Sequence, residues 1–127
     1  QVIPKTGLKT ALMLGDKDFG PHDLLEAETA IKHGAFYFGK LVKKFQGQEL
    51  LAFAGYNGGP HRVGDWLDIR GNQTLDEFIE EIPFDEARGY AKKVARFVAL
   101  YLRMYEGRDG LYIGQNLRSD YRANPKF

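Results

Sequence analysis

Apolar side chains recur at helical spacing over residues 23–47, at steps of three and four, while lysines and a glutamate occupy the other faces. This is the pattern of an amphipathic helix. Asp23 and Glu26 stand as in a capping box, in which the aspartate accepts from first-turn amides and the glutamate reaches back. We therefore expect one long helix from Asp23 to about Gly47. Its buried stripe would be Ala27, Ile31, Ala35, Phe38, Val42 and Phe45.

The next segment, residues 49–56, reads ELLAFAGY and is too uniformly apolar for periodicity to decide its structure. Its alanines and leucines favour a short, wholly buried helix over a strand. Pro60 follows closely and suits the first turn of another helix, where its missing N–H does no harm. We expect that helix to continue through Trp66.

Two more helices are expected downstream. Thr74 and Glu77 form a second capping-box pattern, which opens a brief helix that stops before Pro83. The longest pattern covers residues 87–105 and ends near Gly107. Its wide apolar stripe predicts burial on more than one side. The stripe comprises Ala87, Ala91, Val94, Val98, Tyr101 and Tyr105, widened by Phe97, Leu100 and Met104.

The chain has no convincing strand alternation, so the predicted class is all-α. Its 127 residues suit one compact domain. Residues 111–127 carry no periodic pattern.

Composition narrows the possible partners. Eighteen basic and seventeen acidic residues leave a net charge of +1, too little to favour nucleic acid or an anionic membrane. The absence of cysteine excludes disulfides and a thiolate site within these residues. No stretch is apolar enough to span a bilayer or resembles a signal peptide. We expect no metal and no cofactor, because three histidines lack metal-binding spacing. They are His22, His33 and His61.

Candidate chemistry lies at the end of the buried helix, in GYNGGPHRV. Tyr56 offers an aromatic face and a hydroxyl, and Asn57 offers an amide, which together suit a carbohydrate. Gly58 and Gly59 permit the left-handed backbone that ends a helix. A core aromatic beside a helix cap is the alternative interpretation of the pair.

Three motifs resemble those of the lytic transglycosylases related to the soluble bacterial enzyme, which have a goose-lysozyme-like helical domain. AGYNGGPHRVGDW resembles their Ala-Tyr-Asn-Ala-Gly-Pro segment, and QVIPKT resembles the second half of Gly-Leu-Met-Gln-hydrophobic-Met-Pro-x-Thr. FIEEIPFDEARGYAKKV is similar to Ile-Pro-Phe-x-Glu-Thr-Arg-x-Tyr. The three motifs stand in the family's order. The resemblance implies a transglycosylase domain over residues 1–107 and a C-terminal extension over residues 108–127.

The resemblance implies cleavage of the bond between N-acetylmuramic acid and N-acetylglucosamine in peptidoglycan, with a 1,6-anhydro product. In that family one glutamate acts as general acid and then as base, in a Glu-Ser motif before the Gln-hydrophobic-Met-Pro segment. Gln1 already lies inside that segment, so the family position for this glutamate falls upstream of residue 1. Whether this chain is active alone is left open, although the parent protein is expected to be an enzyme.

By the same resemblance, several side chains would bind substrate. Tyr56 would orient the catalytic glutamate or the sugar near it, Glu80 would contact sugar, and Tyr90 would line the groove. Gln1, Ile3 and Asn57 complete the predicted substrate-binding set. Glu86 and Arg88 are interpreted as a structural ion pair or cap, and Trp66 as a core residue more than a sugar platform.

Two alternatives stay open at this point. One is a peptidoglycan-binding domain without catalysis, and the other is a goose-type lysozyme, whose products would carry a reducing muramic end. Peptidoglycan glycan strands are the expected partner in each case. Periplasmic or cell-envelope location would follow from that substrate, and the sequence does not indicate an oligomeric state.

Overall fold

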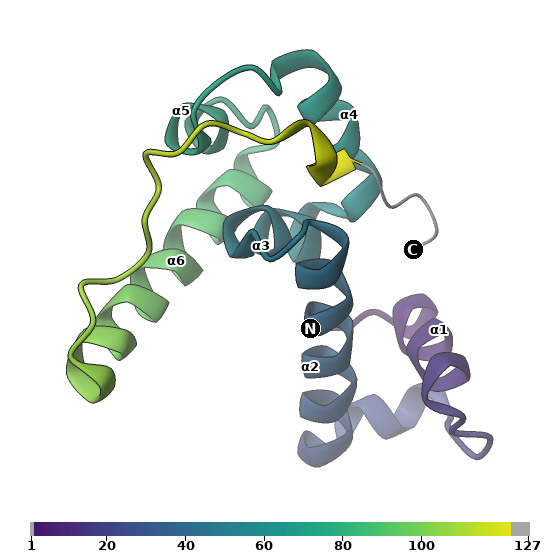
Figure 1. The fold of residues 1–127 in the computed structure, drawn as a ribbon. Helices are drawn as coiled ribbons and strands as arrows, with labels where there is room; N and C mark the ends of the chain where they lie inside the picture. The colour runs from purple at the N-terminus through teal and green to yellow at the C-terminus, as the bar shows by residue number, and fades with distance from the viewer. Residues whose placement is uncertain (1, 123–127) are drawn as a thin grey trace. The chain divides into compact units, whose positions relative to one another are not determined.

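The computed structural model describes residues 2–122, and these form helices joined by short connections and, between α6 and η2, by one long irregular segment (Figure 1). No strand occurs in this range, where an isolated bridge joins Thr74 and Asn116. The all-α prediction is therefore confirmed. The elements are α1 (Pro4–Leu14), η1 (Pro21–Leu25), α2 (Ala27–Lys44), α3 (Glu49–Gly58), α4 (Pro60–Arg70), α5 (Leu75–Glu80), α6 (Asp85–Glu106) and η2 (Ser119–Arg122), where η denotes a 3-10 helix.

The chain divides into two compact units, Gln1–Lys40 and Leu41–Phe127. This differs from the single unit expected from length. Among residues 2–122, no helix is long and apolar enough to cross a membrane.

In the first unit, α1 packs against η1, and a buried polar pair joins α1 to α2. The fully buried His33 lies with Nδ1 2.6 Å from Thr10 Oγ1, and Phe19 stacks on its ring at 4.5 Å. Thr10 Oγ1 donates to the Gly7 carbonyl at 2.8 Å, so the histidine Nδ1–H donates to the threonine oxygen. A polar pair is thus at the centre of this unit.

The predicted start of the long helix is wrong. Asp23 accepts a 2.7 Å hydrogen bond from the Gly20 N–H and so belongs to η1, while α2 begins at Ala27. The predicted stripe is also wrong in this unit, since Ile31 is 71% exposed and Ala35 is exposed. The physical reason is that α2 buries His33, on a different face, against Thr10 and Phe19.

In the second unit, α3 packs against both α4 and α6. Residues 50–55 of α3 are all buried, which confirms the predicted buried helix. Gly58 lies at a close approach of the three helices, because a Cβ there would lie 3.0 Å from Ala87 Cβ and 3.3 Å from Trp66 Cη2. The core of the unit consists mainly of Leu41, Phe45, Leu51, Val63, Leu67, Leu75, Phe78 and Ile82.

Two predicted helix starts in this unit are confirmed. Pro60 occupies the first turn of α4, which continues beyond Trp66 to Arg70. Thr74 caps α5, and its N–H donates to Glu77 Oε2 at 3.2 Å.

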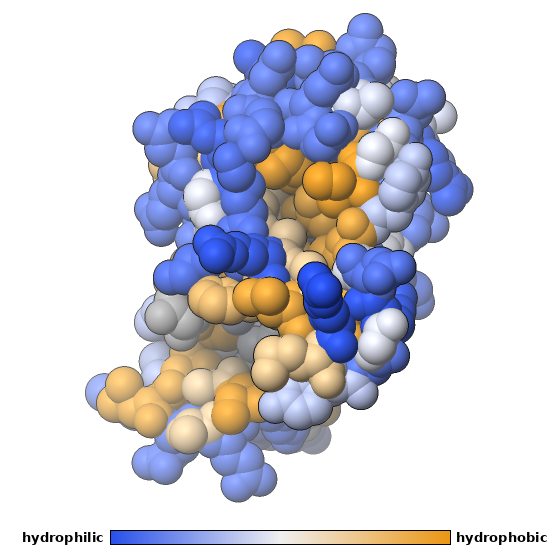
Figure 2. Space-filling model, turned by 90° about the vertical axis from the view of Figure 1, so that its left-hand side faces the viewer, coloured by the Kyte–Doolittle hydropathy of each residue, from blue (hydrophilic) through white to orange (hydrophobic). Residues whose placement is uncertain are grey.

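The breadth of burial predicted for the last helix is wrong. Ala87 and Ala91 are buried in α6, but Phe97 and Tyr101 are exposed and Met104 is 74% exposed. The reason is length: α3 has 10 residues and α6 has 22, so α3 covers the first turns of α6 only. Seen from the side, hydrophobic side chains lie open at the surface beside strongly hydrophilic ones (Figure 2).

Residues 111–117, here called the C-terminal strap, return from the end of α6 to α5 (Figure 1). The Asp76 N–H donates to the Ile113 carbonyl at 3.1 Å, and the Leu75 N–H donates to the Gln115 carbonyl at 2.9 Å. The strap thus belongs to the second unit. Treating residues 108–127 as an extension outside the family domain stays a prediction.

Candidate functional site

The candidate site begins where α3 ends. The Gly59 N–H donates to the Gly55 carbonyl at 3.0 Å and so closes the last turn of α3, and the φ of +91° at Gly59 then ends the helix. Pro60 then starts α4 at once. Tyr56 and Asn57 therefore sit on the last turn of a buried helix, just before a sharp change of direction.

Tyr56 stacks on Tyr90 of α6, with ring centroids 6.2 Å apart and ring planes 7° from parallel. Burial raises the pKa of the Tyr56 phenol above its ordinary value of 10.0, and the charge of an ionised Tyr90 raises it further. Burial also raises the pKa of Tyr90. Both phenols are therefore protonated at neutral pH and can donate hydrogen bonds.

Asn57 lies against the first turn of α6. Its Nδ2 donates to Glu86 Oε1 at 3.2 Å, and its Oδ1 is buried with no hydrogen-bond partner among the described residues. The Asn57 amide therefore has one bonded donor and one unsatisfied, buried acceptor beside the Glu86 carboxylate.

Sequence reasoning missed Glu86 as a site residue. It was paired with Arg88, but Arg88 instead binds Asp85 and the Ile82 carbonyl. One signal could have found Glu86: it precedes Tyr90 by four residues, so both lie on one face of α6. That face meets the end of α3.

A cavity of about 340 Å³ adjoins this region. Arg62 lies over the Phe84 ring at 5.2 Å, and both residues line the cavity with Trp66 and Pro83. Trp66 is only 8% exposed, so its core interpretation is confirmed, although one edge reaches the cavity. A Cβ at Gly58, next to Asn57, would contact both Trp66 and Phe84.

Glu80 is placed elsewhere in the second unit. It pairs with Lys92 at 2.6 Å and lines another cavity, whose described lining includes none of Tyr56, Asn57 and Tyr90. The structure thus joins three predicted residues to one another and not to Glu80.

Two predicted substrate-binding residues remain, and neither lies near the end of α3 in the sequence. Ile3 immediately precedes α1 and is 62% exposed. Gln1 lies outside the described residues. Within residues 2–122, no group of acidic or histidine side chains could hold a metal ion.

Chemically, the end of α3 and the start of α6 offer flat aromatic rings, two phenolic donors, an amide and one carboxylate. Aromatic faces pack on the apolar faces of sugar rings, and the polar groups can bind hydroxyl and acetamido groups. The arrangement suits an uncharged polar ligand with rings more than a highly charged one.

Comparisons with known proteins agree with the fold. Residues 1–79 match the family model described as "Transglycosylase SLT domain". The soluble lytic murein transglycosylase of Salmonella typhimurium is 40% identical over 103 residues, and that of Escherichia coli is 36% identical over the same length. Each match covers 80% of this chain and 16% of the relative, so the chain spans only a small part of those proteins.

A solved structure is also similar. It is the inactive glutamate-to-glutamine mutant of lytic transglycosylase Slt from Pseudomonas aeruginosa, with a TM-score of 0.75 and 31% sequence identity. The match covers 88% of this chain and 18% of that chain.

Proposed function

Because the chain belongs to the transglycosylase SLT domain family, we propose that it forms the lysozyme-like part of a peptidoglycan lytic transglycosylase. The enzyme would cleave the bond between N-acetylmuramic acid and N-acetylglucosamine and leave a 1,6-anhydro ring. The observation that carries the proposal is the joining of Tyr56 to Tyr90 and of Asn57 to Glu86 at one place. The murein transglycosylase relatives support the substrate class.

The reaction needs one carboxyl group that changes role. As an acid it protonates the leaving glycosidic oxygen, and as a carboxylate it takes the proton of the muramic 6-hydroxyl, which attacks the anomeric carbon. We place this general acid and base at the family's Glu-Ser position, upstream of residue 1. This differs from the two-carboxylate arrangement of most glycosidases.

The residues of the second unit would bind and orient the glycan. The Tyr56 and Tyr90 hydroxyls would donate to the sugar or to the catalytic carboxylate, and the Asn57 amide would bind a sugar substituent. We add Glu86 to this set, because its bond to Asn57 places a carboxylate there. A sugar contact of Glu80, like roles of Gln1 and Ile3, stays a prediction.

The proposed reaction also implies a substrate and a cellular location. Peptidoglycan glycan strands would be the substrate, so the protein would work in the periplasm or cell envelope.

The test compares the 127-residue chain with a version extended upstream through the Glu-Ser motif. Each is incubated with purified peptidoglycan, and released fragments are analysed by mass spectrometry. Anhydro-muropeptides from the extended version alone would support the proposal and the upstream position of the acid. Anhydro products from the short chain would refute that position, reducing muramic ends would indicate a hydrolase, and binding without release would indicate a non-catalytic domain.

A further inference from the structure

A second cavity, of about 290 Å³, lies between α5, α6 and the C-terminal strap. Most of its wall is apolar, and its residues come from the second unit alone. Its apolar residues are Leu50, Ile79, Ala95, Ala99, Leu111 and Ile113, and its charged residues are Asp76, Glu80, Lys92 and Arg96.

Three of the four charged groups already have partners. Lys92 Nζ lies 2.6 Å from Glu80 Oε1. Hydrogen bonds from the Thr74 side chain and the Glu77 backbone lower the pKa of the Asp76 carboxyl and keep it ionised. Arg96 makes no hydrogen bond or ion pair with any of residues 2–122. The cavity therefore has one cationic group that is free to bind an anion.

A free guanidinium beside an apolar wall defines the ligand chemistry. Guanidinium binds a carboxylate through two parallel hydrogen bonds, and small-molecule sites combine apolar walls with a few placed polar groups. We propose that this cavity binds an aliphatic group that ends in one carboxylate, with the carboxylate on Arg96. The aliphatic part packs on Ile79, Ala95 and the strap residue Ile113.

Charge limits the ligand to a monocarboxylate. Asp76 and Glu80 lie on the same lining, so a second negative charge on the ligand would be repelled. The volume is at the low end for ligand pockets, which favours a small aliphatic group. Two sources share this chemistry: the C-terminal aliphatic residue of a peptide, and a short free fatty acid.

The C-terminal strap forms one wall of the cavity. Leu111 and Ile113 line it, and the Asp76 N–H bond to the Ile113 carbonyl holds the strap to α5. A ligand packed against both elements would add contacts to this attachment.

The binding experiment uses nuclear magnetic resonance on the isotope-labelled 127-residue chain. N-acetylleucine represents a peptide C-terminus and octanoate represents a fatty acid, and N-acetylleucinamide and octanol are the matched probes without a carboxylate. We expect the acids to shift the methyl signals of Ala95, Ala99 and Ile113 at low millimolar concentration. The tighter of the two acids identifies the source. Absence of shifts at these methyl groups, or equal binding of the neutral probes, would overturn the proposal.

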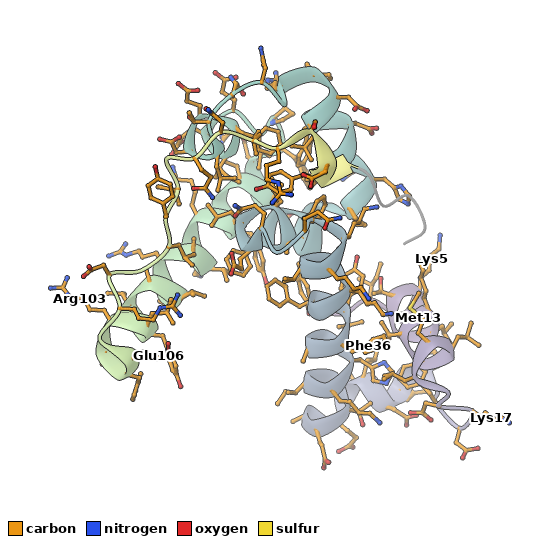
Figure 3. The ribbon with its side chains drawn as sticks, in the orientation of Figure 1. Lys5, Met13, Lys17, Phe36, Arg103 and Glu106 are labelled. Carbon is orange, nitrogen blue, oxygen red and sulfur yellow. The ribbon has the colours of Figure 1, made fainter. Side chains whose placement is uncertain are left out.

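Variants assign the carboxylate to its partner. Arg96→Gln should weaken acid binding by about tenfold or more, because a charged hydrogen-bond partner is lost. Arg103→Gln is the matched control, since Arg103 projects outward from the last turns of the same helix (Figure 3). Ala95→Leu should weaken acids and neutral probes alike by filling the cavity. Equal weakening by the two arginine variants would contradict the assignment, and helix content measured by circular dichroism verifies folding of each variant.

Discussion

At Gly58 the end of α3 lies close to α6, and replacement of this glycine by alanine tests the packing that brings Tyr56 to Tyr90. The added Cβ would lie 3.0 Å from Ala87 Cβ, a distance that real Cβ atoms rarely show. Ala87 Cβ is attached directly to the α6 backbone, so rotation of a side chain cannot relieve the contact. Helix α6 must therefore move away from α3.

The size of the effect follows from two opposing terms. Overpacking of a close interface costs about 1–3 kcal/mol, and replacing glycine by alanine in a helix returns at most about 1 kcal/mol. We expect Gly58→Ala to lower the free energy of unfolding by up to about 2 kcal/mol. A chain of 127 residues lies between the smaller and larger domains for which this relation is known, so each 1 kcal/mol corresponds to about 4 °C in Tm.

Gly64→Ala is the matched control. Gly64 lies inside α4, and a Cβ there would meet nothing within 4 Å. The exchange should raise stability by about 0.5–1 kcal/mol, because alanine has the higher helix propensity.

Thermal unfolding followed by circular dichroism measures both variants, and nuclear magnetic resonance follows the ring signals of Tyr56 and Tyr90. The two exchanges should have opposite signs, and only Gly58→Ala should shift the tyrosine signals. A Gly58→Ala variant as stable as Gly64→Ala, with unshifted tyrosine signals, would refute the close approach of α3 and α6.

Three further predictions concern single groups. Glu86→Gln in the upstream-extended protein should weaken binding to insoluble peptidoglycan by about tenfold in a sedimentation assay, as expected for losing a charged hydrogen-bond partner, while Glu81→Gln, at a carboxylate bound to Arg70 and Gln73, should leave it unchanged; equal weakening by the two variants would contradict the role of Glu86. The folded-state pKa of Tyr56 is above the ordinary value of 10.0, so its contribution to stability is complete below that pH and is lost as pH rises past it. Urea titrations across this range should show a steeper loss of unfolding free energy for the natural chain than for Tyr56→Phe. Parallel curves for the two proteins would contradict the burial argument. Thr10→Val should lower the free energy of unfolding by about 1–3 kcal/mol, since it leaves the buried His33 Nδ1–H without an acceptor, and an unchanged Tm would show that the pair contributes nothing.

Local signals predicted much of the second unit from sequence. Pro60 and the pairing of Thr74 with Glu77 act within one helical turn, so their effect does not depend on distant residues. The same kind of signal gave the wrong helix start at Asp23. The Asp23 carboxylate accepts a hydrogen bond from the Gly20 N–H and so caps η1 instead of α2. A capping pattern indicates that a helix begins nearby, but not which of two adjacent helices it caps.

The burial of α6 and the position of Glu86 depend on tertiary contacts, so local sequence signals could not predict them. The stripe on α6 is continuous in sequence, but the length of α3 decides how much of it is covered. Likewise, Glu86 became a candidate site residue only through its hydrogen bond to Asn57, which lies 29 positions earlier in the sequence. Tyr56 and Asn57 became candidates because the end of a buried helix and a family resemblance pointed to the same two residues, and their role stays a prediction.

The burial of α3 restricts how ligand preference at this site can change. Residues 50–55 support Tyr56 and Asn57 and are also the core of the unit, so a substitution there alters folding and binding together. Glu86 is exposed and Tyr90 is half-buried on α6, where side chains can be exchanged with less effect on the core. New specificity, in nature or in the laboratory, is therefore expected to arise on the α6 side while the α3 side stays fixed.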